Sequence, residues 1–340
     1  MIGCTRPFLE AYLRERLMAH ANIPRLKGRA RGLRFTSGRV SGVLFSEGND
    51  AGAPHTLPCD LVVDAMGRSS RLGEWLSEAG WQPPALERLH VDLGYATGVF
   101  ARDPADSGTL AIHSLVLRPG RLPLLSTMTA VEGNRSIVTI AGYAQDRPTR
   151  DVKEFLEWCR QDPSGEFGRI VDQHEMLEGV TTFRYPDNRR KIFSRLSRFP
   201  GGLLALGDSV ASFNPIRAQG MSSACLHAAC LDDYLRGKPS LADPARGYFE
   251  SIGRVVDAAW MMSTTSDSLL PHSNATPTRG DRAFNALNGL VFRASVVDRE
   301  VHRRFLDVVH MRAHPRTLMR PGTLLRAARR WRTDISLVGA

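Results

Sequence analysis

The segment FPGGLLALGDSVASFNPIRAQGMSSACLHAACLDDYL, residues 199–235, holds a strand signal, a turn-rich loop and a helix signal in direct succession. The short apolar run 203–206, bounded by glycines, predicts a strand buried on both faces. The small and apolar residues that alternate over 221–235 predict a helix packed on a sheet. Gly207 and Asp208 follow the strand at its carboxyl end, where α/β sheets bind ligands. The segment therefore predicts an α/β fold with a ligand site at this turn.

The residue types around the turn favour a polyol attached to an electron-rich group. The carboxylate of Asp208 can accept hydrogen bonds from sugar-like hydroxyls. A helix that opens at Gly220 directs free N–H groups and a partial positive charge at whatever lies ahead of it. An ordinary strand–loop–helix crossover with a surface aspartate is the alternative interpretation.

The sequence pattern GD-x6-P-x3-QGM resembles the second flavin motif of FAD-dependent monooxygenases. This superfamily includes aromatic-ring hydroxylases, squalene epoxidase and geranylgeranyl reductase. The resemblance implies that Asp208 binds the ribityl hydroxyls of FAD. It also implies that the backbone of residues 219–221 approaches N1 and O2 of the flavin. The motif assigns six positions to the cofactor site: Gly207, Asp208, Pro215, Gln219, Gly220 and Met221.

Two positions in the loop depart from the family pattern. Ala218 stands where the family has glycine, and Arg217 stands where an aromatic residue is common. A methyl group at a glycine position obstructs close backbone approach or disfavours a positive φ.

A second stretch, DLVVDAMGRSS at residues 60–70, has buried-strand character followed by a glycine turn. It resembles D-x-V-V-D-A-x-G-R-x-S of the same family, which lies beside the FAD, and so assigns Asp64, Gly67 and Arg68 to the site. Near the start, RPFLEAYLRERL is similar to a family segment whose arginine lies near the FAD pyrophosphate. Arg6 is the matching position, and a guanidinium there can pair with phosphate. A plain helix-end charge is the alternative for Arg6.

The family opens with a strand, a G-x-G-x-x-G turn and a helix that carry the pyrophosphate. No such turn occurs in this sequence. The expectation is that roughly a hundred residues of the family, about the size of a small domain, are absent, and that this chain binds FAD weakly or not at all. The two explanations are a coding sequence that is truncated or starts late, and a degenerate relative of the family. An open sheet edge or exposed apolar face and self-association are expected to follow.

The predicted fold class is α/β: an incomplete FAD-binding three-layer α/β domain, a mostly antiparallel β substrate domain and C-terminal helices. The corresponding ranges are 1–87 with 199–236, then 88–198, then 237–340. Strands are expected at 23–34, 39–46, 61–64, 91–100, 114–117, 136–143, 180–185 and 203–206. Helices are expected from Thr5, at 151–160, at 221–235, from 243, within 284–309 and at 324–331. The residues that could line a substrate pocket are Tyr95, Tyr143, Phe183 and Arg184, although aromatic residues in strands are commonly plain core.

Charge, cysteine content and hydropathy restrict the partners and the cellular compartment that the sequence favours. The net charge of +10 over 340 residues comes almost wholly from scattered arginines, which argues against nucleic acid. Five cysteines without C-x2-C spacing argue against a metal site or disulfides and favour the cytoplasm. No apolar run reaches membrane-span length. The basic end 324–331 is either a solvated helix face or a membrane-surface contact.

The resemblance therefore implies an FAD-dependent oxidoreductase, a monooxygenase that hydroxylates or epoxidises an apolar or aromatic small molecule with NAD(P)H as electron donor. No catalytic side chain is assigned, because the flavin carries the chemistry in this superfamily. Three alternatives stay open: a reductase of an isoprenoid double bond, a non-catalytic protein of this fold that binds a ligand or partner, and a basic scaffold for acidic partners.

The pattern Trp260…Asp267…Pro271 is also similar to the family's W-x6-D-x3-P.

Overall fold

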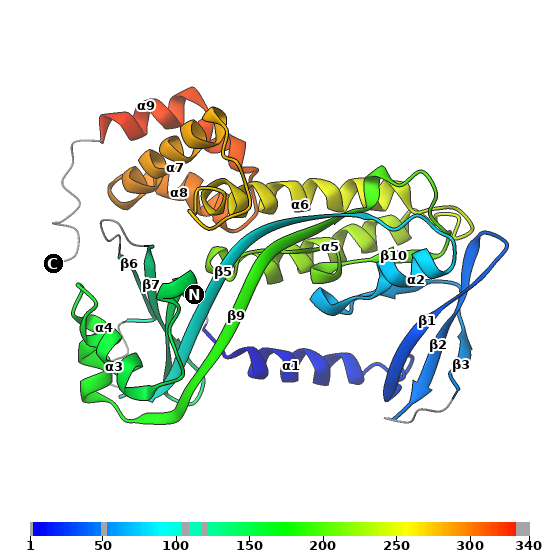
Figure 1. Ribbon diagram of the computed structural model, residues 1–340, viewed down its shortest axis with the longest axis horizontal. Helices are drawn as coiled ribbons and strands as arrows, with labels where there is room; N and C mark the ends of the chain where they lie inside the picture. The colour runs from blue at the N-terminus through cyan, green and yellow to red at the C-terminus, as the bar shows by residue number, and fades with distance from the viewer. Residues whose placement is uncertain (1–2, 49–52, 104–108, 117–121, 331–340) are drawn as a thin grey trace. The chain divides into compact units, whose positions relative to one another are not determined.

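The computed structural model describes residues 3–48, 53–103, 109–116 and 122–330 (Figure 1). The chain divides into two compact units, residues 1–26 with 91–186 and residues 27–90 with 187–340. Two long strands, β5 (Ala85–Ala101) and β9 (Met176–Ile192), belong partly to each unit. The predicted α/β class is confirmed.

The first unit is built on an antiparallel sheet in the order β9-β5-β8-β7-β6. Its other strands are β6 (Ala111–Val116), β7 (Leu124–Val131) and β8 (Arg135–Tyr143). Helices α3 (Val152–Arg160) and α4 (Glu166–Gln173) pack beside this sheet (Figure 1), burying Phe155 and Phe167 against Phe100. The prediction of a mostly antiparallel sheet for this part of the chain is confirmed.

Helix α1 (Arg6–Met18) begins where Thr5 accepts a hydrogen bond from the N–H of Phe8, as the capping pattern predicts. The backbone N–H and the hydroxyl of Thr5 both donate to Glu132, at 2.9 and 2.5 Å. No residue of α1 is buried. The helix is therefore tied to the sheet of the first unit at its start.

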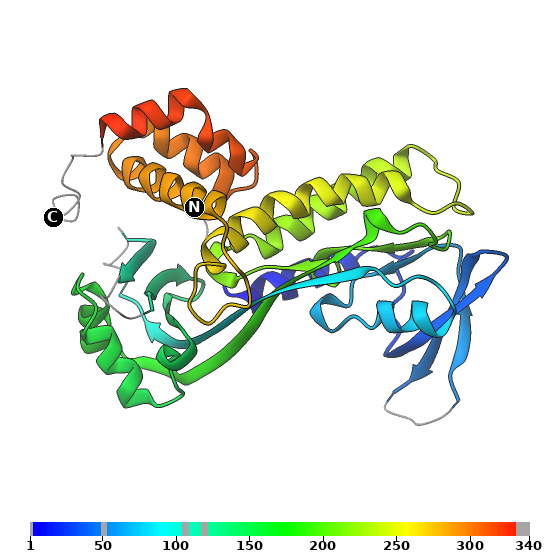
Figure 2. The same ribbon diagram turned by 45° about the horizontal axis from the view of Figure 1, so that its top comes forward.

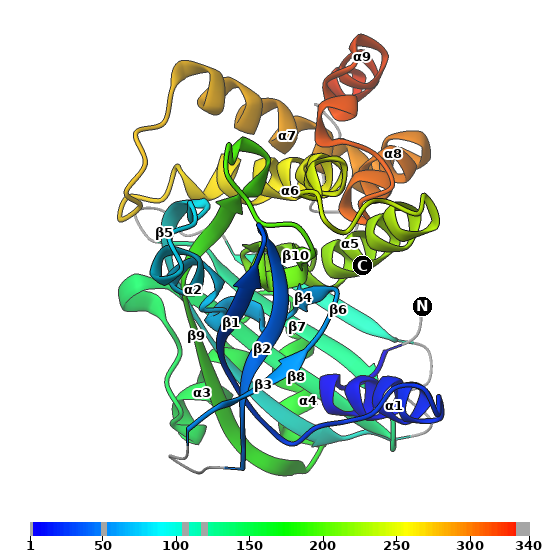
Figure 3. The same cartoon turned by 90° about the vertical axis from the view of Figure 1, so that its right-hand side faces the viewer.

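The second unit combines two small sheets with six helices among its described residues. Strands β1 (Gly28–Thr36), β2 (Arg39–Glu47) and β3 (His55–Pro58) form an antiparallel sheet (Figure 3). Strand β4 (Val62–Asp64) pairs in parallel with β10 (Leu203–Ala205), with Ala205 opposite Asp64. The two-residue strand β11 (Ala211–Ser212) pairs with the end of β9.

The helices of this unit are α2 (Leu72–Glu78), α5 (Gly220–Arg236), α6 (Arg246–Asp267), α7 (Arg279–Val297), α8 (Arg299–Val309) and α9 (Pro321–Arg329). Helices α5 and α6 run side by side (Figure 2). Tyr248 of α6 is fully buried and donates to the carbonyl of Ala205, which anchors α6 on β10. A separate cluster of Val291, Val301 and Ala327 holds α7, α8 and α9 together.

Several local predictions differ from the structure. Strands β3, β7 and β11 and helices α2 and α4 were not predicted. Strand β7 mixes serine and threonine with its apolar residues, and α4 follows a glycine at φ +72°. Helix α6 begins at Arg246 rather than at Asp243, because Ala245 still has a non-helical ψ of 55°. The predicted strand 180–185 is part of the much longer β9. Leu117 and Trp331, the last residues of the predicted strand 114–117 and the predicted helix 324–331, lie outside the described residues.

Candidate functional site

The two predicted turns lie next to each other at the carboxyl ends of paired strands. Gly207 and Asp208 follow β10, and Gly67 follows β4 by three residues. Both glycines have positive φ, +62° and +68°. A Cβ added to Gly67 would lie 4.0 Å from the Cβ of Asp208. Because parallel strands end at the same edge of a sheet, the turns at Gly67 and Gly207, 140 residues apart, meet there.

Asp208 and Asp64 have different surroundings at this edge. The side chain of Asp208 is exposed. Asp64 is buried, and its carboxylate accepts hydrogen bonds from the N–H of Met66 and the hydroxyl of Ser70. Lys191 in turn donates to Ser70 at 3.2 Å, and burial lowers the pKa of Lys191. Asp64 therefore shapes its own turn, whereas Asp208 faces outward and can contact a ligand.

Arg68 is half-buried and bound to its own unit. Its guanidinium donates to Oγ of Ser212 at 2.8 Å and to Asp187 at 2.6 Å. Arg189 donates to the same carboxylate. Burial alone would raise the pKa of Asp187, but the two guanidinium groups lower it on balance. Arg68 thus links the turn after β4 to β11 and β9.

The loop between β11 and α5 contains a capped 3-10 turn followed by one left-handed residue. Asn214 caps the 3-10 turn Pro215–Arg217 by accepting from the N–H of Ile216. Ala218 then has φ +54° and ψ +25°, the left-handed conformation that favours glycine. The departure of this sequence from the family's glycine therefore falls on a residue with a glycine-type backbone. Pro215 is exposed.

The N-terminus of α5 is open to approach. Gln219 is its N-cap, without a side-chain capping hydrogen bond, and the helix is 17 residues long. A Cβ added to Gly220 would meet no atom within 4 Å, and Met221 is 67% exposed. The first N–H groups of a helix have no intrahelical acceptor, so this end favours an electron-rich group.

A buried polar cluster lies behind this loop and was not predicted as part of the site. Asp267, at the end of α6 and 1% exposed, accepts from the side-chain amides of Asn188 at 2.8 Å and Asn214 at 3.0 Å. Arg217 lies 3.7 Å from the other carboxylate oxygen and donates to Ser266. Burial raises the pKa of Asp267, against the charge of Arg217. These partners are 50 to 79 residues from Asp267, so only the W-x6-D-x3-P similarity pointed to it.

These features fit one end of FAD. An outward carboxylate suits ribityl hydroxyls, and an unobstructed helix N-terminus suits the pyrimidine edge of a flavin. Two buried side-chain atoms near the loop, Oε1 of Gln219 and Nε of Arg217, have no hydrogen-bond partner within the part of the chain that is described.

Comparisons of the structure find solved proteins of the same fold. The flavin-dependent brominase Bmp2 superposes with a TM-score of 0.61 at 15% identity, covering 90% of this chain and 70% of that one. The anhydrotetracycline hydroxylase OxyS from Streptomyces rimosus gives 0.55 at 14% identity, covering 89% and 55%. For 2-methyl-3-hydroxypyridine-5-carboxylic acid oxygenase in its tetrameric form the TM-score is 0.55 at 17% identity, with coverage of 78% and 65%. The chain has the FAD-dependent monooxygenase fold.

Sequence comparison finds a relative that is longer than this chain. Protein Rv3254 of Mycobacterium tuberculosis (strain ATCC 25618 / H37Rv) is 29% identical over 281 residues, which make up 80% of this chain and 59% of that protein. The chain thus spans about three fifths of this relative's length. The sequence matches no protein-family model. The resemblance inferred from the sequence is confirmed at the level of the fold.

Nine of the ten predicted site residues belong to the second unit, and Arg6 belongs to the first. Arg6 forms an ion pair with Glu10 on α1, at 2.6 Å. Its contact with a pyrophosphate stays a prediction.

The four substrate-pocket candidates lie in the sheet of the first unit. Tyr143 is buried, and the rings of Tyr95 and Phe183 are 5.3 Å apart. Arg184 donates to Asp92 at 2.9 Å. Two of the four therefore pack on each other and one forms an ion pair, while a substrate contact stays a prediction.

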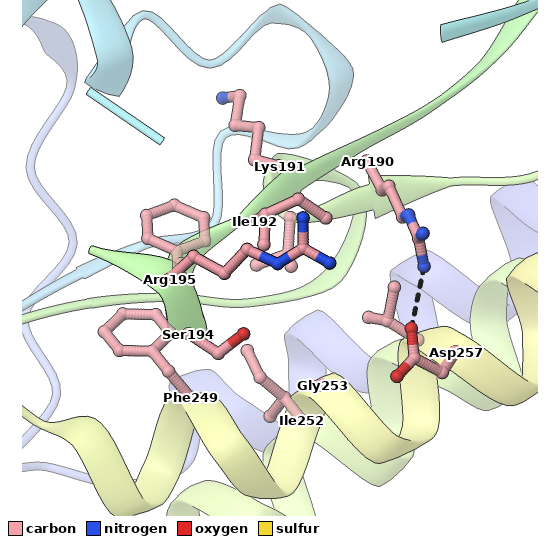
Figure 4. Close-up of a pocket in the computed structure, with 12 residues that line it drawn as sticks. Arg190, Lys191, Ile192, Ser194, Arg195, Phe249, Ile252, Gly253 and Asp257 are labelled. Carbon is pink, nitrogen blue, oxygen red and sulfur yellow. Dashed lines mark hydrogen bonds and ion pairs between the residues drawn. The ribbon is translucent and has the colours of Figure 1, made fainter. Parts of the chain in front are cut away.

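One cavity of about 100 Å³ lies between residues 190–195 and helix α6 (Figure 4). Figure 4 shows Arg190 turned toward Asp257, with which it pairs at 2.7 Å, and the ammonium of Lys191 directed away from α6. None of the ten predicted site residues lines it. The volume is well below the roughly 300–1,000 Å³ of pockets for drug-sized ligands, so the cavity does not hold a flavin.

Within the described ranges, no group of three or more His, Cys, Asp or Glu side chains could hold a metal ion. No helix there combines the length and the apolar character that crossing a membrane requires.

Proposed function

We propose that this chain binds the ribityl and pyrimidine end of FAD and acts in an FAD-dependent oxidoreductase that hydroxylates or epoxidises an apolar or aromatic small molecule. The observation that carries the proposal is the position of Asp208. Its exposed carboxylate follows a buried parallel strand and lies beside Gly67, in the unit that also holds the open N-terminus of α5. The flavin-dependent brominase and the hydroxylase of similar fold support a flavin as the cofactor.

In this proposal the protein binds and orients the cofactor, and FAD supplies the redox chemistry when it is bound. Asp208 accepts hydrogen bonds from ribityl hydroxyls. The N–H groups at residues 219–221 stabilise negative charge on the pyrimidine ring. NAD(P)H is the proposed electron donor, the cytoplasm the proposed location, and nucleic acid is not a proposed partner.

A membrane-surface contact through α9 is a further part of the proposal. Leu325 is 62% exposed on this helix, beside a basic face. Arg326 is already paired with the buried carboxylate of Asp298, at 2.8 Å. A solvated helix face therefore remains the competing interpretation.

The test is a titration of FAD into the wild-type chain, the Asp208→Ala variant and the Asp232→Ala variant, followed by quenching of flavin fluorescence. Asp232 is an exposed aspartate of α5 and serves as the matched control. Charge-assisted hydrogen bonds contribute about 1.5–3 kcal/mol each. Asp208→Ala should therefore raise the dissociation constant for FAD by about tenfold or more. Asp232→Ala should leave this constant unchanged.

Affinity is expected to be low, because the sequence has no G-x-G-x-x-G turn for the pyrophosphate, so the titration extends to high FAD concentration. Absence of saturable binding, or tight binding that Asp208→Ala leaves unchanged, contradicts the proposal. Bound FAD that neither NADPH nor NADH reduces would favour the non-catalytic alternative.

A further inference from the structure

A buried histidine lies directly behind the Gly207–Asp208 turn. His227 of α5 is fully buried, and its Nδ1 accepts a hydrogen bond of 3.0 Å from the backbone N–H of Gly207. Its Nε2 lies 3.4 Å from Oγ of Ser223, one helical turn earlier. Because Nδ1 accepts a hydrogen bond, the ring is neutral and carries its proton on Nε2.

The environment of the ring favours this neutral form. Burial lowers the pKa of His227 to about 4, and no charged side chain contributes to the shift. The ring is thus uncharged at neutral pH and remains an acceptor for the Gly207 N–H.

The turn is held from both ends. At its start, a Cβ added to Gly207 would lie 3.6 Å from the Cβ of Ala224, so the turn packs closely on α5. At its end, the hydroxyl of Ser209 lies 2.7 Å from the carbonyls of both Asp64 and Leu206. Asp208 is the residue between these two anchors, so its direction follows from them.

We propose that His227 is a positioning residue for Asp208: by accepting the Gly207 N–H, it sets the direction in which the turn presents the carboxylate. The role rests on the proposed FAD site. A leucine at position 227 would fill the same space but leave a buried N–H without an acceptor. An asparagine would keep an acceptor near the position of Nδ1.

The experiment compares His227→Leu, His227→Asn and Ser223→Ala with the wild type. Ser223→Ala is the matched control, since it removes the contact at Nε2 and leaves the one at Nδ1. The first measurement is hydrogen exchange of the Gly207 amide by NMR, relative to the Leu204 amide. We expect exchange to be about tenfold faster in His227→Leu, the effect of losing one buried hydrogen bond, and close to wild type in the other two.

The second measurement is FAD affinity, which should fall about tenfold in His227→Leu and be restored in His227→Asn. The third needs no variant: the imidazole ¹⁵N shifts of the wild type should show the Nε2–H tautomer. Unchanged Gly207 exchange in His227→Leu, or a proton on Nδ1, overturns the positioning role. If the wild type binds no FAD, the proposed function fails, while the amide exchange and the tautomer still decide the role of His227.

Discussion

The side-chain amide of Asn214 donates a hydrogen bond of 3.0 Å to the buried carboxylate of Asp267. The two residues are 53 positions apart, and the contact joins the end of α6 to the loop that leads into α5. Arg217, three residues after Asn214, turns toward the same carboxylate. A loop whose outer face is proposed to meet a flavin is therefore fixed by charge and amide contacts on its inner face.

Replacing Asp267 should destabilise the fold. Asp267→Ala removes the acceptor that Asn188 and Asn214 share and the partner of a half-buried guanidinium. We expect a loss of about 3 kcal/mol in the free energy of unfolding, the low end for breaking a buried ion pair. Asp267→Asn should lose less stability, because its amide oxygen can still accept hydrogen bonds from the two asparagines. Urea denaturation measures both, with Asp232→Ala as an exposed control.

The raised pKa of Asp267 gives this prediction a pH dependence. A carboxyl whose pKa is higher in the folded than in the unfolded state stabilises the fold at low pH, and this contribution is lost as pH rises through the folded-state pKa. The stability difference between the wild type and Asp267→Asn should therefore shrink as pH rises above about 4. A difference that grows with pH would show that the pair with Arg217 outweighs burial.

Ala218→Gly should stabilise the chain. Ala218 has φ +54°, and an L-residue pays roughly 1–2 kcal/mol in the left-handed region, part of which the flexibility of glycine in the unfolded state offsets. We expect the free energy of unfolding, measured by urea denaturation, to rise by about 0.5–1 kcal/mol. Ala224→Gly, in the regular part of α5, should instead lose about 1 kcal/mol. Equal effects at both positions would rule out backbone strain at Ala218.

Asp92 should stabilise the first unit through Arg184 and Arg147. It has φ +47° in β5 and pairs with both guanidinium groups. Burial alone would raise the pKa of Asp92, but Arg184 and Arg147 lower it on balance. A lowered folded-state pKa means stability that is lost as pH falls below about 4.

In Asp92→Asn, the free energy of unfolding should accordingly fall less below about pH 4 than it does in the wild type. In Asp92→Ala, amide hydrogen exchange over residues 93–101 should be faster than in the wild type. Asp172→Asn, which removes an exposed ion pair with Arg160, is the control and should change neither. If Asp92→Asn loses as much stability at low pH as the wild type does, the pH dependence comes from another carboxyl group.

The isolated chain is expected to self-associate through α1. Phe8, Tyr12, Leu13 and Leu17 are each 47–55% exposed on this helix, and exposed apolar patches promote association. Replacing Phe8 and Leu13 by serine should lower the apparent mass in light scattering. The same exchange at the polar positions Arg14 and Glu15 is the control. A monodisperse wild-type monomer contradicts the prediction.

Local sequence was sufficient for the elements with strong, short-range signals. The apolar run before Gly207 and the Thr5 cap both occur where they were predicted. The spacing GD-x6-P-x3-QGM likewise indicated the correct fold. These signals depend on residues within a few positions of one another, where backbone preference and side-chain capping act directly.

Tertiary structure alone decided what lies behind those motifs. Nothing in the sequence near His227 shows that its ring accepts the N–H of Gly207, and nothing near Asp267 shows that two asparagines converge on it. Likewise, only the packing distinguishes Asp64, buried in its own turn, from Asp208, which faces outward. A buried polar group must find its partner wherever the packed chain brings one within hydrogen-bond distance, and that partner has no fixed separation along the sequence.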